Sequence, residues 1–109
     1  MGFEDKIAAM VPRYLMRTED RVSKLRRVLT EAGGGGSAGA IGEVRLALHD
    51  IAGTAPVMGL AEVGALARQG DDIAARLAAY DGPIDADALA PLRAIVDRLS
   101  EEVLRVRAG

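Results

Sequence analysis

The chain has 109 residues, a mass of 11.4 kDa and a formal charge of −2 from 14 basic and 16 acidic side chains. This length predicts one domain with one hydrophobic core, and the charge balance argues against a nucleic-acid partner. The lack of cysteine and the presence of one histidine exclude a disulfide framework and a cysteine- or histidine-rich metal site. An acidic N-terminus and short apolar runs predict no signal peptide, no membrane span and a cytoplasmic location.

Apolar residues recur at helical spacing along nearly the whole chain, and no alternation typical of strands is present. The first apolar stripe runs from Ile7 to Leu29. Pro12 interrupts this stripe, which predicts a short N-terminal helix or a kink near that residue. The composition of 33–40 predicts a flexible glycine-rich loop.

The rest of the chain predicts three more helices. The second helix is expected over 40–57, with Gly59 ending it and a third helix following directly. Either Asp85 or Asp87 is expected to cap the last helix. Four amphipathic helices with short connections predict an all-α, antiparallel four-helix bundle that takes up residues 1–109 as one domain.

The single histidine is expected to point away from the core. On a wheel of about 100° per residue, the apolar residues of its helix form one arc, and His49 lies roughly 130° from the centre of that arc. Arg45, Leu46 and Gly53 share the outward face, and Pro56 lies close to it. An exposed leucine beside a residue without a side chain indicates a docking patch for another protein. The alternative is a bystander histidine beside a scattered surface leucine.

The segment that follows this histidine resembles the phosphorylation-site segment of histidine-containing phosphotransfer (HPt) domains. In the family pattern, two residues separate the histidine from a lysine, which is followed by a glycine and a small residue. A second glycine comes six residues after the first. The matching residues here are His49, Gly53, Thr54, Ala55 and Gly59, with Ile51 at the apolar position. The likeness continues over 60–67, which resembles the start of the next helix of the family, and at the acidic pair Asp71-Asp72.

This resemblance implies a phosphorelay carrier and not an enzyme with its own active site. His49 would be the phosphorylated residue, because a neutral exposed imidazole has a free ring nitrogen that attacks an aspartyl phosphate. The implied partners are response-regulator receiver domains and a hybrid histidine kinase. No cofactor or metal site is expected in this chain, since the receiver supplies Mg²⁺. No nucleic-acid or membrane partner is expected, and the chain is expected to act as a monomer.

The sequence departs from the family pattern at Ala52, where the family usually has a lysine. Arg45, one turn before His49, is a candidate to supply a cation instead, and the alternative is that it is a solvated surface charge. Gly53 is expected to give clearance to the partner. The side chains expected to form the docking face are those of Leu46, Ala52 and Pro56.

Two other functions stay open at this point. Because Ala52 stands where the family has a lysine, one alternative is a catalytically silent HPt-like adaptor that binds receivers without accepting a phosphoryl group. His49-Asp50, followed by Thr54 and Pro56, also has a distant likeness to the acceptor segment of histidine-kinase dimerisation bundles. The spacing of the threonine and proline differs from that family, and such a hairpin needs two chains. The initiating methionine and the capped ends favour a free-standing protein over a fragment of a hybrid kinase.

Overall fold

The computed structural model describes residues 2–31, 38–80 and 84–109. It contains four helices, and the residues it describes form no β-strand. The prediction of an all-α four-helix bundle is therefore confirmed. The helices are α1 (Phe3–Glu31), α2 (Ala38–Thr54), α3 (Ala61–Ala78) and α4 (Ala86–Ala108).

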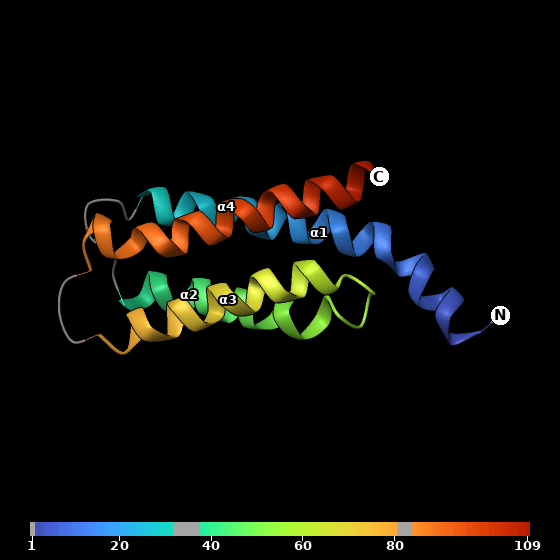
Figure 1. Cartoon of the computed structure of the whole chain (residues 1–109), viewed down its shortest axis with the longest axis horizontal. Helices are drawn as coiled ribbons and strands as arrows, with labels where there is room; N and C mark the ends of the chain where they lie inside the picture. The colour runs from blue at the N-terminus through green and yellow to red at the C-terminus, as the bar shows by residue number, and fades with distance from the viewer. Residues whose placement is uncertain (1, 32–37, 81–83) are drawn as a thin grey trace.

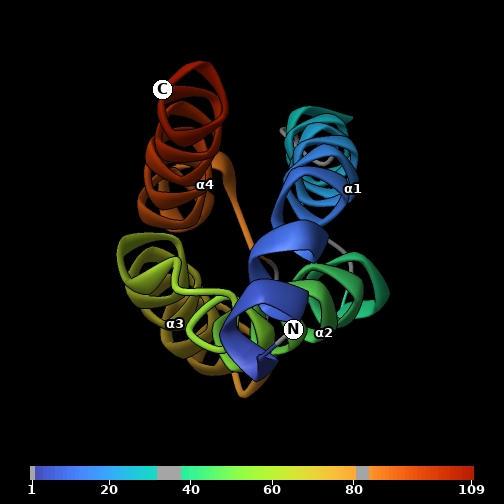
Figure 2. The same cartoon turned by 90° about the vertical axis from the view of Figure 1, so that its right-hand side faces the viewer.

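The four helices lie side by side along the long axis of a molecule that measures 53 × 23 × 17 Å. Figure 1 shows the chain reversing its direction along this axis from each helix to the next. Viewed end-on in Figure 2, α2 lies next to α1 and α3, while α4 lies next to α3 and α1. The most extensive helix–helix contact is between α2 and α3, and this pair carries the candidate site.

The core consists of aliphatic side chains contributed by all four helices, as the apolar stripes of the sequence predict. Helix α4 begins at Asp85, whose side chain accepts a hydrogen bond of 2.8 Å from the backbone N–H of Ala88 and thereby confirms one of the two expected caps. The largest side chains that are almost fully enclosed are Leu29, Ile41, Leu48, Ile51, Leu89, Leu92 and Leu99.

Helix α1 passes through Pro12 without a break, so the proline does not separate a short N-terminal helix. Figure 1 shows the N-terminal end of α1 tilted relative to the rest of the helix and extending past the other helices. A proline inside a helix removes one backbone hydrogen bond and its ring crowds the preceding turn, which favours such a change of direction. The expected kink near Pro12 agrees with this shape.

Helix α2 differs from its predicted range at both ends. It ends at Thr54 and not at residue 57, because Pro56 has no N–H and disfavours helical geometry in the residue before it. The turn closes when the N–H of Leu60 donates to Ala55 O (2.9 Å), and Gly59 adopts a φ of +77°, which favours glycine. At the other end, the predicted loop over 33–40 is wrong for 38–40, which belong to α2, while 33–37 lie outside the described residues.

Two glycines set how closely the neighbours of α3 approach it. A Cβ atom at Gly64 would lie 2.8 Å from Cγ of Pro56, and one at Gly70 would lie 2.9 Å from Cδ1 of Leu48. A side chain at Gly64 would crowd the ring of Pro56, and one at Gly70 would displace the end of Leu48. The sequence alone indicates only that these glycines lower helix propensity. In the part of the chain that the structure describes, no helix is long and apolar enough to cross a membrane.

Candidate functional site

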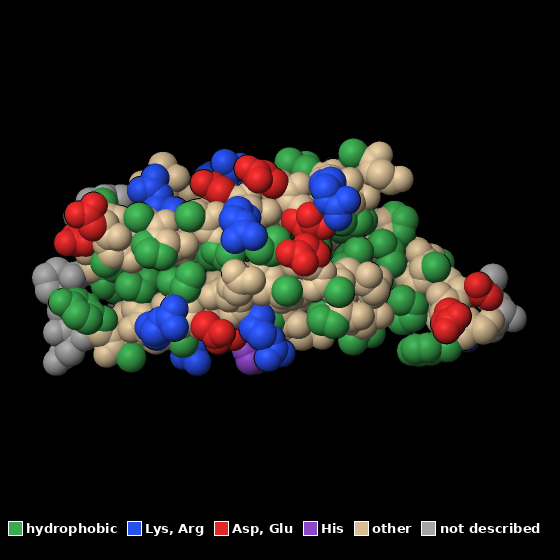
Figure 3. Space-filling view, viewed as in Figure 1, with side chains coloured by type: hydrophobic (Ala, Val, Ile, Leu, Met, Phe, Trp, Pro, Cys, Tyr) green, Lys and Arg blue, Asp and Glu red, His purple; other side chains and the backbone are tan. Residues whose placement is uncertain are grey.

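The one histidine of the chain stands on the outer face of α2, as the helical wheel predicts. Its side chain is 76% exposed, whereas the preceding residue, Leu48, is fully buried. The arc opposite the histidine faces the core, with Val44 and Ile51 also buried. In Figure 3 the purple side chain of His49 reaches the surface of the α2–α3 side among acidic and basic side chains. The imidazole is therefore open to an approaching protein.

Asp71 of α3 holds the imidazole from the neighbouring helix. Its Oδ2 lies 3.0 Å from Nδ1 of His49, and its Oδ1 lies 3.6 Å from Nε of Arg45. The Asp71 side chain is only 16% exposed, and Oδ1 is buried without a hydrogen-bond partner. An ionised carboxylate only accepts hydrogen bonds, so Nδ1 of His49 carries the proton and donates it. This arrangement leaves the lone pair of Nε2 free.

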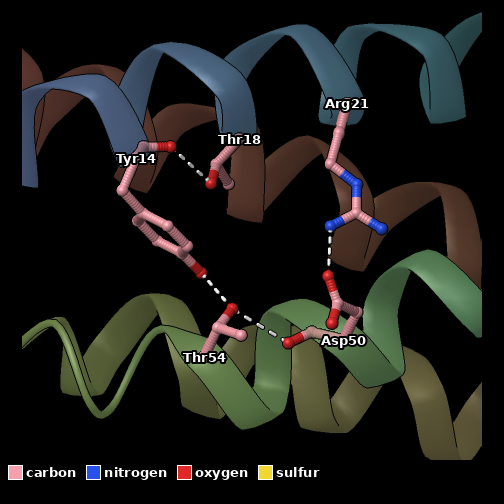
Figure 4. A network of polar contacts seen from close by, with 5 residues as sticks. All are labelled: Tyr14, Thr18, Arg21, Asp50 and Thr54. Carbon is pink, nitrogen blue, oxygen red and sulfur yellow. Dashed lines mark hydrogen bonds and ion pairs between the residues drawn. The ribbon is translucent and has the colours of Figure 1, made fainter. Parts of the chain in front are cut away.

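Helix α1 fixes the α2 segment that carries the histidine from the other side. The hydroxyl groups of Tyr14 and Thr54 are 2.7 Å apart, and Thr54 also donates to the backbone carbonyl of Asp50 at 2.9 Å. Nη1 of Arg21 donates to Oδ2 of Asp50 at 2.5 Å. Figure 4 shows these contacts joining α1 to α2, with the Asp50 side chain directed toward Arg21. The negative charge next to His49 in the sequence is thus paired with a cation of α1.

A small hollow beside the imidazole, which we call the His49 hollow, has a volume of about 190 Å³. This volume is far above the roughly 10–15 Å³ that one water molecule requires, so a small anion also fits. At Gly53, an added Cβ atom would meet no atom within 4 Å. The glycine therefore leaves open space and does not serve helix packing. The residues that line the His49 hollow are His49, Ala52, Gly53, Arg68, Asp71 and Asp72.

The residues expected to form the docking face do not all lie on it. Leu46 is 73% exposed, in agreement with the expectation. Ala52 agrees with it only in part, because it lines the His49 hollow but only 9% of the residue is exposed. It lies three helical turns after Ile41, so it stands at the edge of the buried face of α2. Pro56 is exposed, but it is in the turn after α2 and its ring packs against Gly64 instead of lining the His49 hollow.

The charged neighbours of the histidine also differ from the expectation. Arg45 is half-exposed and is paired with Asp71, so it is not simply a solvated charge. Arg68 lines the His49 hollow but was not predicted to take part in the site. Finding Asp71 and Arg68 requires the register between α2 and α3. The sequence signal for that register is Gly70, because Leu48 packs against its bare backbone. The next residue of each helix, Asp71 and His49, is then in contact.

The arrangement suits a nucleophile that receives a group brought by another molecule. One imidazole nitrogen is fixed by a carboxylate, the other has a free lone pair, and a hollow with a cation lies next to it. Among the residues that the structure describes, no cluster of three or more histidine, cysteine, aspartate or glutamate side chains could hold a metal ion.

Comparison with known protein families gives one match. The model of the family described as Hpt domain matches residues 9–106, which is nearly the whole chain. No significant match to a curated protein or to a solved structure is found.

Proposed function

The chain belongs to the Hpt domain family, and on that basis we propose that it is a phosphorelay carrier whose phosphoryl group is borne by His49. Hpt domains transfer phosphoryl groups through a histidine, and they are phosphocarriers that interact with receiver domains and histidine kinases. The observation that supports His49 is the exposure of the only imidazole in the chain, held at Nδ1 by Asp71.

The proposed reaction begins when Nε2 of His49 attacks the phosphorus of a receiver aspartyl phosphate. The N–P bond forms as the P–O bond to the aspartate breaks, and the carboxylate leaves with the electron pair of that bond. Because Nδ1 keeps its proton, the imidazole ring becomes cationic as it gains the phosphoryl group. Passing the group to a second receiver reverses these changes, and the electron pair of the N–P bond returns to Nε2.

Asp71 has two tasks in this scheme. Its hydrogen bond to Nδ1 selects the tautomer with a free Nε2, and its negative charge stabilises the cationic ring of the product. The carboxylate is mostly buried, so its interaction with the ring is screened less than that of a surface ion pair. Arg45, at 3.6 Å from the other carboxylate oxygen, offsets part of this buried charge when the imidazole is neutral.

The face around His49 is the proposed contact surface for a receiver domain. Leu46 supplies an exposed apolar side chain, and Gly53 leaves the approach to the imidazole unobstructed. The receiver contributes its phosphorylated aspartate and the Mg²⁺ that accompanies it. We propose a hybrid histidine kinase as the source of the phosphoryl group and a response regulator as its destination.

One observation favours a second candidate function. The position at which the family usually has lysine is Ala52, so the chain lacks that cation at the site. A protein that binds receivers without accepting a phosphoryl group would have the same surface. The histidine-kinase hairpin has less support, because the four helices of one chain enclose the hydrophobic core without a second chain.

The two functions are separated by incubating the protein with a receiver domain phosphorylated on its aspartate. We expect a radioactive phosphoryl group to move to the wild-type chain as an acid-labile, base-stable label. The His49→Gln variant, which removes the nucleophile, should bind the receiver but remain unlabelled. A wild-type chain that binds the phosphorylated receiver and stays unlabelled would establish the adaptor function instead.

A further inference from the structure

The His49 hollow is lined by a cation, Arg68, that has no part in the reaction proposed for His49. Arg68 projects from α3 and lines this hollow together with the imidazole. Ala52 and Gly53 also line the hollow, and their small side chain and bare backbone leave its space open. A group attached to the imidazole therefore has room in a hollow that Arg68 also lines.

The three arginines around the histidine are not in the same state. Arg21 is bound to Asp50, and Arg45 is paired with Asp71. Arg68 has acidic residues three and four positions later on its own helix, Asp71 and Asp72. Within the described residues, however, its side chain forms neither an ion pair nor a hydrogen bond. Arg68 is thus the arginine of this group that is free to bind an incoming anion.

The charges of the site favour such a cation once the histidine is modified. A phosphoryl group brings between about −1.5 and −2 charges to a hollow that already contains Asp71 and Asp72. The cationic ring and Arg45 offset only part of this negative charge, so a further cation favours the transfer. The guanidinium group of arginine is planar and always charged, and it donates two parallel hydrogen bonds to phosphate oxygens.

We propose that Arg68 binds the phosphoryl group on His49 and stabilises it during transfer. This inference rests on the proposed function, since it needs a phosphorylated His49. Arg68 of α3 would then supply the cation that α2 lacks at Ala52. Arg45 would pair with Asp71 and not with the phosphoryl group.

The test uses phosphoramidate, a small donor that phosphorylates histidine and releases ammonia, so no receiver has to be identified. The Arg68→Gln variant should be phosphorylated at His49 about five- to tenfold more slowly than the wild type, because an exposed charge-assisted contact is lost. The matched control is Arg76→Gln, which removes the same charge from an exposed position two turns further along α3 and away from the His49 hollow. This control should react at the wild-type rate.

Two further measurements separate binding from a structural effect. In the Arg68→Gln background, Ala52→Lys introduces a cation from α2 at a residue that lines the His49 hollow and should restore most of the rate. In the ¹H–¹⁵N spectrum, the Nε–H signal of Arg68 should shift when His49 is phosphorylated, while that of Arg76 should not.

Equal phosphorylation rates in Arg68→Gln and Arg76→Gln, with an unchanged Arg68 signal, would overturn the role of Arg68 and leave the carrier function intact. A wild-type chain that gains no phosphoryl group at His49 from phosphoramidate or from a phosphorylated receiver would overturn both proposals.

Discussion

Two consecutive residues of α2, Leu48 and His49, lie on opposite faces of the helix. Leu48 is fully buried against α3, while the side chain of His49 is 76% exposed. The inner face is aliphatic and packs as a core, whereas the outer face carries an imidazole, a glycine and an exposed leucine. A helix that is buried on one side thus presents a reactive group on the other, and packing fixes the position of that group.

The inner face also determines the partner of the histidine. Leu48 fits over Gly70, where a Cβ atom would lie only 2.9 Å from its Cδ1. This contact sets the register of α2 against α3, and the next residue on each helix forms the 3.0 Å contact between His49 and Asp71. Stability and chemistry therefore depend on neighbouring contacts of one interface.

The largest expected effect tests the division between the two faces directly. Leu48→Ala should lower the free energy of unfolding by about 2–5 kcal/mol, because it leaves a cavity in a closely packed core. His49→Gln, one residue away, should change that free energy by less than about 0.5 kcal/mol, since the side chain is exposed. Chemical denaturation followed by circular dichroism measures both. Similar losses in the two variants would show that α2 has no such division.

A pair of glycine substitutions applies the same comparison to the backbone. Gly64→Ala should lower the free energy of unfolding by about 1 kcal/mol, because crowding against the ring of Pro56 exceeds the gain in helix propensity. Gly53→Ala should raise it by about 0.5 kcal/mol, because the new methyl group meets no atom. Thermal unfolding of the two variants gives the difference. A Gly64→Ala variant as stable as Gly53→Ala would contradict the packing described for α3.

The smallest expected effect on stability is that of Gly53→Gln, which should also slow phosphoryl transfer. Gly53→Gln should leave the free energy of unfolding nearly unchanged, because the side chain extends into open space. The same side chain should slow transfer from a phosphorylated receiver by obstructing its approach to His49. Phosphorylation by phosphoramidate, a much smaller donor, provides the control and should be affected less. Equal receiver transfer rates in Gly53→Gln and the wild type would refute the clearance role of Gly53.

The fold could be predicted from the sequence because each helix carries its own apolar stripe. The stripe places Leu48 inside and His49 outside without knowledge of any other helix, and Asp85 marks the start of α4 locally. These predictions rest on helical periodicity and capping, which are properties of a single segment. They therefore hold without the tertiary structure.

The candidate site was predicted only in part because it depends on contacts between helices. Asp71 and Arg68 lie about twenty positions beyond the histidine, and only the α2–α3 register places them beside it. Ala52 does line the His49 hollow, but it is almost buried because the wheel places it above Ile41. The prediction for the end of α2 gave too little weight to Pro56.

The role of His49 as the phosphoryl carrier is tested by locating the phosphoryl group after transfer from a phosphorylated receiver. Mass spectrometry of peptides kept at alkaline pH, where phosphohistidine survives, should find one added phosphoryl group on the peptide that contains His49. That imidazole should carry the phosphoryl group, and the His49→Gln variant should carry none. A phosphoryl group found on any other residue, or an unmodified His49 peptide from a chain that binds the receiver, would contradict that role.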